Sequence, residues 1–268
     1  MNKYKILEGQ YIEACGKKLY RIQALKDFDG VKAGDTGGYI ENESNLSQSG
    51  DAWVYDDAWV SGNARVCGNA EVSDDAQVYD DAWVCDNTRV CGNAQVSGNA
   101  QVSGNARVSD DARVYGNVQV YDNAQVYDNA QVCGNARVYG NAEVSGDARV
   151  YGNAEVYGNA WVHGNAEVYG NAWVSGNARV RGDARVYGTR HYLNLGPIGS
   201  RYGYTTISRD KSKKAIVVCG CFHGDLDEFE RAVHKTHAGT KYEAEYMALI
   251  QLARLREKEW LENGRDST

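Results

Sequence analysis

The chain has 268 residues, a net charge of −7, 30 glycines, 19 tyrosines and a single proline. This acidic balance does not favour a nucleic-acid partner, and no apolar run approaches the length of a membrane span. Seven scattered cysteines, an odd number, argue against a disulfide framework and favour a reducing compartment. The opening residues, MNKYKILEGQ, lack the apolar core of a secretory signal. We therefore expect a cytoplasmic protein of a bacterium or of a phage-infected host, with no membrane contact.

The N-terminal segment, residues 1–48, ends in a degenerate copy of a hexapeptide that recurs through the middle of the chain. This copy runs from Ile40 to Leu46 and is followed by a two-residue insertion before the regular array begins. An uncovered end of a stacked-strand array would expose unpaired backbone groups and invite polymerisation. We therefore expect residues 1–48 to form an N-terminal β cap.

Residues 49–186 form an uninterrupted array of hexapeptides. Valine returns at every sixth position from Val54 to Val186, 23 times, and alanine lies two residues before each valine except at Thr88 and Val118. The valine is followed, after one variable residue, by Gly or Asp and then by Asn or Asp. The repeating unit is therefore Ala-x-Val-x-(Gly/Asp)-(Asn/Asp).

Each hexapeptide reads as a short strand followed by a corner. Alanine and valine alternate with the variable residues, so they point inward while the variable side chains point outward. Glycine, asparagine and aspartate tolerate the left-handed backbone conformation that a corner needs. Three such units close one triangular coil, and successive triangles stack at about 4.8 Å.

This pattern resembles the hexapeptide-repeat class of left-handed β-helices. The fold class is therefore mainly β: a single-stranded left-handed parallel β-helix followed by a small C-terminal α+β domain. A right-handed solenoid, as in bactofilin-like filaments, is the alternative. The segments KDFDGVKAGDTGGYI, from Lys26, and NLSQSGDAWVYD, from Asn45, also resemble YdcK-like bacterial proteins, which are described as acyltransferases without a secured activity.

Outward residues at equivalent positions of successive coils, three hexapeptides apart, are expected to stack in ladders along the array. One ladder comprises Tyr121, Tyr139 and Tyr157, a second comprises Tyr151, Tyr169 and Tyr187, and Cys67 stacks on Cys85. Stacked aromatic rings stabilise neighbouring strands. The tyrosines either serve only this purpose or present a flat surface to a partner subunit or a planar ligand.

One corner of the array is unusually acidic and is a candidate cation site. Its members are Asp56, Asp57, Asp74, Asp75, Asp110, Asp111, Asp128, Asp147 and Asp183. Stacked carboxylates repel one another, so a hard cation such as Ca²⁺ would bind between coils, with Asp56, Asp74, Asp75 and Asp110 as ligands. In the alternative interpretation, Asp merely replaces Gly or Asn at a solvated corner.

The hexapeptide resemblance also implies an enzyme class. Many proteins of this class are trimeric acyltransferases that use acetyl-CoA or acyl carrier protein, with a catalytic histidine as general base in a groove between subunits. The array contains one histidine, His163, at an outward position beside Trp161. The coils here have no inserted loop to build a groove, and a shared fold is weak evidence for function.

After Val186 the repeat stops. Residues 187–200 contain the only proline and are expected to form a linker, and residues 201–268 a C-terminal α+β module. We expect strands at 202–208 and 215–222, a helix opened by Asp225 with Glu228 in a capping box, and a second helix over 241–261. The expected buried residues of the second helix are Tyr246, Ile250, Ala253 and Leu255. The segment from about 198 to 255 resembles a module of phage and prophage proteins with no assigned activity.

This module holds the densest polar cluster of the chain. Cys219, Cys221 and His223 alternate along one expected strand, and His234 and His237 lie one helical turn apart, so these five residues are candidate zinc ligands. Cys221 and His237 are also a candidate nucleophile and base pair. In a further interpretation, five residues together form a binding site for an anionic ligand: Arg201, Thr205, Thr206, Arg209 and Lys211. The alternative is that the cysteines are packing residues and the histidines solvated.

Three functions fit these observations. The first is a non-catalytic β-solenoid scaffold, encoded by a phage or prophage, that forms a homo-oligomer such as a trimer and carries a C-terminal partner-binding or ligand-binding module. It requires no cofactor. The second is an acyltransferase that uses acetyl-CoA, with His163 or a C-terminal histidine as base. The third is a viral protein that sequesters a small anionic molecule.

Overall fold

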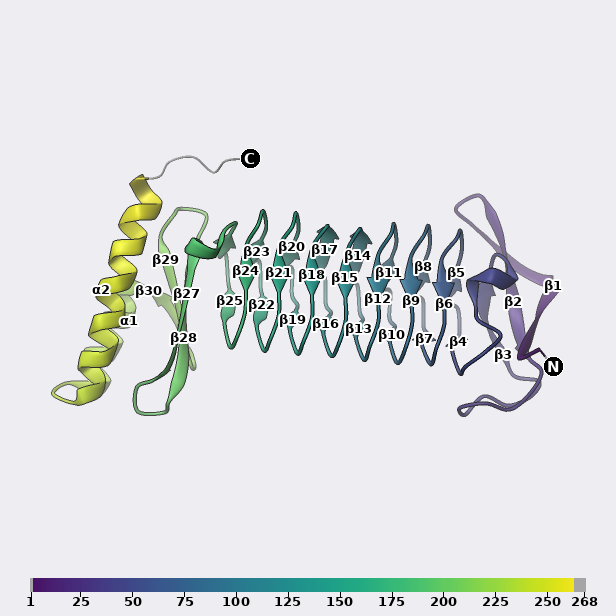
Figure 1. Ribbon diagram of the computed structural model, residues 1–268, viewed down its shortest axis with the longest axis horizontal. Coiled ribbons are helices and arrows are strands. Elements are labelled where there is room, and N and C mark those ends of the chain that lie inside the picture. Colours follow the sequence, from purple (N-terminus) through teal and green to yellow (C-terminus); the bar gives the residue numbers. More distant parts are fainter. Residues whose placement is uncertain (1, 263–268) are drawn as a thin grey trace.

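The computed structural model describes residues 2–262, so the last six residues of the expected C-terminal module lie outside the described part. The molecule is a mainly β rod in which a parallel β-solenoid of about eight coils separates an N-terminal hairpin layer from a small C-terminal domain (Figure 1). This confirms the predicted fold class. The handedness of the coil stays a prediction of the hexapeptide resemblance.

Three sheets run along the rod and form its three faces. The first face continues into the N-terminal strands, and its strands are β1 (Tyr4–Ala14), β2 (Lys17–Ala24), β3 (Thr36–Ile40), β5 (Trp59–Val60), β8 (Gln77–Val78), β11 (Gln95–Val96), β14 (Arg113–Gly116), β17 (Gln131–Gly134), β20 (Arg149–Val150), β23 (Glu167–Val168) and β26 (Arg185–Val186). The second face comprises β4 (Trp53–Val54), β7 (Glu71–Val72), β10 (Arg89–Val90), β13 (Arg107–Val108), β16 (Gln125–Val126), β19 (Glu143–Val144), β22 (Trp161–His163) and β25 (Arg179–Arg181). The third face comprises β6 (Arg65–Val66), β9 (Trp83–Val84), β12 (Gln101–Val102), β15 (Gln119–Val120), β18 (Arg137–Val138), β21 (Glu155–Val156) and β24 (Trp173–Val174).

The hexapeptide pattern explains this architecture residue by residue. Strands of successive coils pair in parallel, each residue with its equivalent three hexapeptides later, as Val132 pairs with Val150. The inward alanines and valines have at most 1% of their surface exposed. The first corner residue has a positive φ, from 51° at Asp56 to 90° at Gly116, which is why Gly or Asp occupies it. The degenerate hexapeptide joins the same sheet, because Ile40 pairs with Val60.

The N-terminal strands cover the first coil. Strand β2 pairs in antiparallel fashion with both β1 and β3, and β3 then pairs in parallel with β5. Trp53 is buried under this layer, with its ring centroid 6.2 Å from that of Tyr4 and 5.3 Å from that of Phe28. The short 3₁₀ helix η1 (Glu43–Asn45) lies between β3 and the second-face strand β4. These aromatic contacts close the apolar interior at this end.

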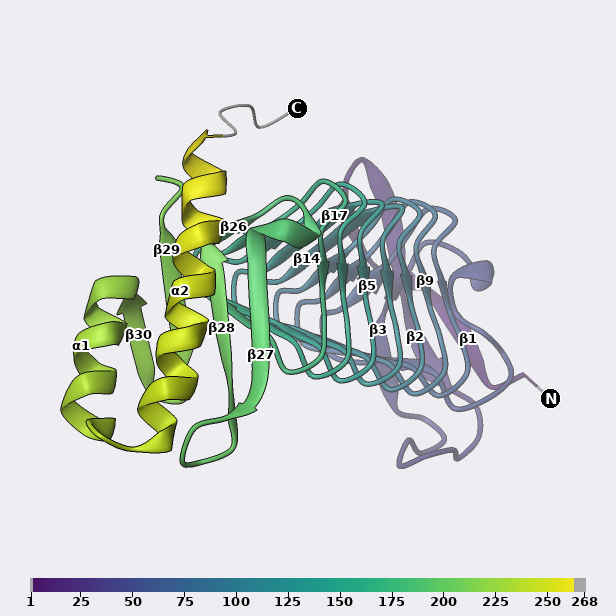
Figure 2. The same cartoon turned by 60° about the vertical axis from the view of Figure 1, so that its left-hand side comes forward.

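The C-terminal domain is an antiparallel sheet with two helices on one side. The sheet comprises β27 (Tyr192–Ile198), β28 (Gly203–Arg209), β29 (Ala215–Cys219) and β30 (Phe222–Asp225), and it is preceded by the 3₁₀ helix η2 (Thr189–His191). The helices are α1 (Leu226–His237) and α2 (Lys241–Glu262). The sheet lies between the last coils and the helices (Figure 2). Neither helix within residues 2–262 has both the length and the apolar character needed to cross a membrane.

Two expectations for this domain are wrong. Residues 187–200 do not form a linker, because they contain η2 and the strand β27, which pairs with β28. The expected strand over 215–222 is instead a hairpin that turns at residues 220 and 221. The capping box is confirmed: the Glu228 N–H donates to the Asp225 carboxylate at 2.7 Å, and the Asp225 N–H donates to Glu228 at 3.1 Å.

The buried face of α2 is confirmed in part. Tyr246, Ile250 and Ala253 are buried as expected, but Leu255 is 68% exposed. Leu249 and Trp260 complete the buried face instead, and the indole N–H of Trp260 donates to the backbone carbonyl of Arg190 at 3.0 Å. This hydrogen bond ties the end of α2 back to the 3₁₀ helix that leaves the solenoid.

Candidate functional site

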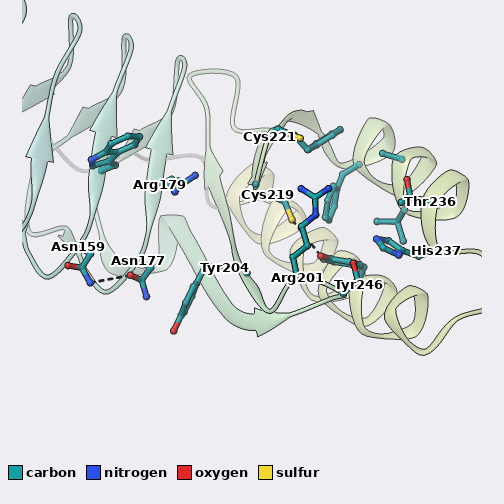
Figure 3. A pocket seen from close by; sticks show the side chains of 18 residues that line it. Asn159, Asn177, Arg179, Arg201, Tyr204, Cys219, Cys221, Thr236, His237 and Tyr246 are labelled. Atoms are coloured by element: carbon teal, nitrogen blue, oxygen red, sulfur yellow. Dashed lines mark hydrogen bonds between the residues drawn. The ribbon is translucent and has the colours of Figure 1, made fainter.

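A cavity of about 650 Å³ lies where the last coils of the solenoid meet the C-terminal domain (Figure 3). One wall comes from the solenoid: Asn159, Trp161, Asn177 and Arg179, which lie on two successive coils. The opposite wall comes from three parts of the C-terminal domain, namely the turn between β27 and β28, the hairpin turn between β29 and β30, and the inner faces of α1 and α2. Its lining residues there are Ser200, Arg201, Gly203, Tyr204, Cys219, Gly220, Cys221, Phe222, Phe229, Ala232, Val233, Thr236, His237 and Tyr246.

Strand β28 fixes the two walls relative to each other. The backbone N–H of Arg179 donates to the Thr206 hydroxyl at 2.8 Å, and that hydroxyl donates to Asn194 on β27 at 3.1 Å. Ala184, on the last coil, forms an antiparallel bridge with Asp210. The solenoid side of the cavity is therefore joined to the sheet by backbone and side-chain hydrogen bonds.

The turn that carries Arg201 is packed directly on α2. Gly199 has a φ of +71°, and a Cβ at this position would lie 2.0 Å from the Tyr246 hydroxyl, so only glycine fits. The Gly199 N–H donates to the Glu245 carboxylate at 2.8 Å. These contacts set the position from which the Arg201 side chain enters the cavity (Figure 3).

The floor of the cavity is apolar and well packed. Phe229 and Tyr246 are buried, with an edge-to-face contact at 5.6 Å between ring centroids, and Phe222 packs against Phe229 at 5.0 Å. The His237 ring stacks on Tyr246 at 5.5 Å. Burial, with a smaller effect from the neighbouring Cys219 thiol, raises the pKa of Tyr246 to about 12, so its hydroxyl stays protonated at neutral pH.

The candidate residues for an anionic ligand do not gather in one place. Of the five, only Arg201 lines the cavity. Thr205 and Thr206 are buried in β28 and bonded to Cys219 and Asn194, respectively. Arg209 is buried with its guanidinium 5.0 Å from the Tyr187 ring centroid, and Lys211 is exposed in the turn that follows β28.

The five candidate zinc ligands are also separated, because the placement of three of them on one strand is wrong. Cys219 ends β29, Cys221 lies in the turn, and His223 belongs to β30. His223 is exposed, and its Nε2 would lie 2.9 Å from a Cβ placed on Gly182, beside the last coil. The Nδ1 of His234 is 2.6 Å from Glu243. Cys219, Cys221 and His237 do line the cavity together.

The acidic corner does not assemble a cation site either. The Asp74 carboxylate accepts a hydrogen bond from the Gly92 backbone N–H of the next coil at 2.9 Å, and those of Asp56 and Asp110 lie 3.5 and 3.4 Å from the equivalent nitrogens. The carboxylates of Asp111, Asp147 and Asp183 accept from asparagine side chains of the previous coil. Asp75 instead donates its N–H to the Gly92 carbonyl. Within residues 2–262, no group of three or more His, Cys, Asp and Glu side chains is arranged to hold a metal ion.

The predicted tyrosine ladders stack in the structure, except that the Tyr187 ring is tilted by 35° against Tyr169. Tyr121, Tyr139 and Tyr157 stack at 4.8 and 5.0 Å with ring planes 3° apart. The Tyr139 hydroxyl donates to Glu155 on the next coil at 3.1 Å, and burial together with this carboxylate raises its pKa to about 12. These three tyrosines are half-buried on the third face and do not line the cavity. His163 is exposed on the second face, with Nδ1 3.0 Å from the Ser145 hydroxyl, and does not line the cavity.

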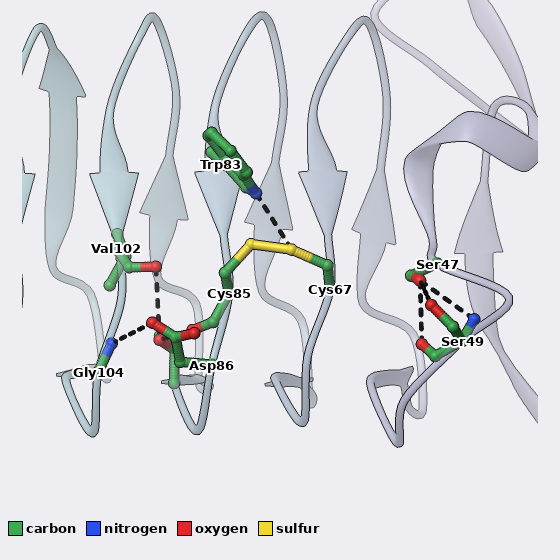
Figure 4. The surroundings of a disulfide bond; sticks show 9 residues. Ser47, Ser49, Cys67, Trp83, Cys85, Asp86, Val102 and Gly104 are labelled. Atoms are coloured by element: carbon green, nitrogen blue, oxygen red, sulfur yellow. Dashed lines mark hydrogen bonds between the residues drawn. A yellow bond between two sulfur atoms is a disulfide. The ribbon is translucent and has the colours of Figure 1, made fainter.

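The expectation of unpaired cysteines is wrong for one pair. Cys67 and Cys85 stack as predicted, with Cα atoms 4.7 Å apart, and form a disulfide on the third face (Figure 4). Adjacent coils bring outward residues within the Cα separation that a disulfide requires. The Trp83 indole N–H donates to the Cys67 sulfur at 3.1 Å. Cys15, Cys91, Cys133, Cys219 and Cys221 are free.

The solenoid side of the cavity was not identified from the sequence. Trp161 and Arg179 occupy equivalent positions of successive coils, so their stacking on the second face is readable from the repeat, and the guanidinium lies 5.4 Å from the Trp161 ring centroid. Both residues lie on the last coils of the array, next to the domain that follows in the chain, and this position could have predicted that the domain covers them. Tyr204, Phe222 and Phe229 gave no such signal, because each reads as an ordinary strand or helix residue.

Together these features define a parallel β-solenoid protein of the hexapeptide-repeat type with a C-terminal α+β domain, and a ligand-sized cavity lies between the two. Comparison with known proteins agrees with the fold. Residues 100–116, 106–122, 130–146 and 148–164 match the model of the YdcK β-solenoid repeat. Over 63 residues the chain is 43% identical to YdcK of Escherichia coli K12, described as an uncharacterized acetyltransferase; this match covers 21% of this chain and 19% of that protein.

Among solved structures, the comparison also finds the UDP-N-acetylglucosamine acyltransferase of Francisella novicida. It has 13% sequence identity and a TM-score of 0.32, over 83% of this chain and 87% of that one. A similarity at this level supports no inference about activity. The match to YdcK spans about a fifth of that protein's length, so it does not carry over the activity of the whole protein either.

Proposed function

We propose that this chain is a non-catalytic β-solenoid binding protein whose ligand occupies the cavity between the last coils and the C-terminal domain. The observation that carries the proposal is the cavity itself: its volume of about 650 Å³ falls within the usual range for small-molecule sites. Its walls combine apolar rings with a few polar side chains, which is the usual composition of such sites. The solenoid is a rigid support that holds one wall in place.

The rest of the rod fits a scaffold better than a second site. Each hexapeptide from residue 52 to residue 186 follows the previous one without insertion, so the faces are uniform. Uniform flat faces with stacked tyrosines suit contact with another subunit, and we include a homo-oligomer, such as a trimer, in the proposal. Phage origin and a cytoplasmic location are also proposed, and they rest on the sequence resemblances and composition given above.

Native mass spectrometry tests the proposal, with the purified protein first incubated with a bacterial small-molecule extract. We expect a bound mass on the wild-type protein that is lost in Ala232→Trp, because residue 232 lines the cavity and an indole there would fill it. Lys235→Trp, on an exposed position of the same helix, is the matched control. No bound mass on the wild type, or equal binding by both variants, would overturn the proposal.

Acyl transfer is the second candidate function. It is favoured by the similarity to YdcK and by the presence of Cys221 and His237 in the same cavity, where His237 would act as base. His163, on the exposed second face, is the alternative base. Turnover of acetyl-CoA with an acceptor from the extract, lost in His237→Gln or His163→Gln, would establish this activity. If acetyl-CoA neither binds nor is consumed, the transferase is excluded.

A further inference from the structure

The charge of the cavity contrasts with the charge of the chain. The whole chain carries a net charge of −7, and residues 49–186 contain 18 acidic side chains. Among residues 2–262, no aspartate or glutamate lines the cavity, whereas Arg179, Arg201 and His237 do. In an acidic protein, a cavity that excludes carboxylates and holds two guanidinium groups is suited to an anion.

The two arginines are available to a ligand. Within the described part of the chain, neither Arg179 nor Arg201 forms an ion pair with a carboxylate. Arg137 and Arg185, elsewhere on the rod, each form one. Arg179 comes from the last coils, and Arg201 comes from the turn fixed by Gly199 on α2. The guanidinium groups therefore line the cavity from opposite walls, Arg179 from the solenoid and Arg201 from the C-terminal domain (Figure 3).

A third donor comes from the end of an asparagine ladder. Along one corner of the solenoid, each Asn side-chain N–H₂ group donates to the equivalent side-chain oxygen of the next coil, through Asn69, Asn87, Asn105, Asn123, Asn141, Asn159 and Asn177. Asn177 accepts from Asn159 at 3.2 Å and is the last member. Its own amide group has no further coil to donate to, and it lines the cavity.

Two partly exposed aromatic side chains line the same cavity as these donors. Trp161 is 42% exposed and Tyr204 is 40% exposed, and they lie on opposite walls. The Arg179 guanidinium lies over the Trp161 ring, an arrangement that holds a guanidinium in place without neutralising it. An exposed indole beside a positive charge offers stacking and electrostatic attraction to the same molecule.

We propose that the cavity binds a planar aromatic molecule that carries a phosphate group, such as a nucleoside monophosphate. The two guanidinium groups supply the positive charge that attracts the phosphate, the Asn177 amide is a further donor on the solenoid wall, and the ring stacks on Trp161 or Tyr204. A phosphate dianion matches the two guanidinium groups in charge. This inference rests on the proposed function, because it assumes that the cavity is the ligand site.

Isothermal titration calorimetry with AMP, GMP, CMP and UMP tests the inference, with adenosine and inorganic phosphate as partial probes. We expect at least one monophosphate to bind, and the nucleoside alone and phosphate alone to bind at least about tenfold more weakly. Arg179→Gln and Arg201→Gln should each weaken binding by about 10- to 100-fold, as expected for loss of a charge-assisted hydrogen bond. Arg181→Gln, an exposed residue on the same strand as Arg179, should leave binding unchanged.

Three results of these titrations would overturn the inference. It fails if none of the four monophosphates binds, if adenosine binds as tightly as AMP, or if binding is indifferent to Arg179→Gln and Arg201→Gln while both variants keep the wild-type melting temperature. A neutral molecule recovered from the extract and lost in Ala232→Trp would refute this ligand class and leave the proposed function intact. If no molecule is recovered from the extract and no monophosphate binds, the inference and the proposed function are both refuted.

Discussion

Asp128 and Gly146 occupy the same corner of neighbouring coils, and the Asp128 carboxylate accepts a hydrogen bond from the Gly146 backbone N–H at 2.9 Å. The same contact joins Asp86 to Gly104 and Asp80 to Gly98. Asp128 has a φ of 58°, a conformation that costs most residues about 1–2 kcal/mol. Aspartate, one of the few non-glycine residues that tolerate this backbone conformation, also supplies the hydrogen bond.

Replacement of Asp128 separates these two effects. Asp128→Ala should lower the free energy of unfolding by about 1–2 kcal/mol, because it removes the hydrogen bond and leaves a less tolerant residue at positive φ. Asp128→Gly loses the same bond but relieves the backbone, so its stability should lie closer to that of the wild type. Urea denaturation of the three proteins checks this order, and an alanine variant as stable as the glycine variant would contradict it.

The tyrosine ladder of the third face makes a second prediction. Tyr139 stacks on both neighbours and donates to Glu155, so Tyr139→Ser should destabilise the protein by about 1–2 kcal/mol at roughly 0.5–1 kcal/mol per stacked pair. Tyr139→Phe keeps both stacked pairs and loses only the half-buried hydrogen bond to Glu155. Its loss should be less than half that of the serine variant, which thermal unfolding of both variants will show.

The Cys67–Cys85 disulfide predicts a response to reduction. The crosslink joins residues with a sequence separation of 18, for which the loop-entropy model gives a stabilisation of about 3 kcal/mol as an upper value. Cys67→Ser should lower the melting temperature under oxidising conditions and abolish its sensitivity to a reductant. Cys91→Ser, which alters a free cysteine of the second face, is the control and should keep the wild-type response. An intact mass that does not change on reduction would disprove the crosslink.

Lys3 predicts a dependence of stability on pH. It is buried, donates to the Ala52 carbonyl at 2.7 Å, and burial lowers its pKa from 10.5 to about 8. Below pH 8 both the folded and unfolded states hold the proton, and the full cost of burying the charge is present. Between pH 8 and 10.5 the unfolded state binds more protons, so stability rises with pH.

The variant Lys3→Met isolates this effect from the titration of other groups. The melting temperature of the wild type, relative to that of Lys3→Met, should increase from pH 7 to pH 10. A difference that stays constant over this range would show that Lys3 does not change its protonation on folding. Comparison at fixed ionic strength keeps the screening of surface charges equal.

Most of the rod was predictable because the repeat couples local conformation to long-range contact. The period of three hexapeptides per coil determines that Val132 faces Val150 and that Tyr121 faces Tyr139, so each ladder can be read from the sequence. The same rule placed Cys67 beside Cys85, and only their oxidation was misjudged. Oxidation depends on the cellular environment as well as on distance, so the number of cysteines was a poor guide.

The cavity was not predictable in the same way. Trp161 and Arg179 belong to the repeat, whereas Arg201 and Phe229 belong to a segment with no repeat, and no periodicity relates the two sets. The decisive local error was the hairpin turn at Gly220, whose φ is +59°. A Cys-Gly-Cys segment reads equally well as a continuous strand, and that interpretation moved His223 onto the wrong strand.

The unbroken register of the array has a consequence for how such a protein varies. Deletion or duplication of three consecutive hexapeptides removes or adds one whole coil, which leaves every ladder aligned and both closed ends unchanged. The separation between the two ends then changes in steps of about 4.8 Å. An insertion of any other length would shift each later strand to a different face or position, and its outward residues would no longer align with the ladders. The solenoid is therefore a spacer whose length changes by whole coils, while the N-terminal cap and the C-terminal domain keep their structures.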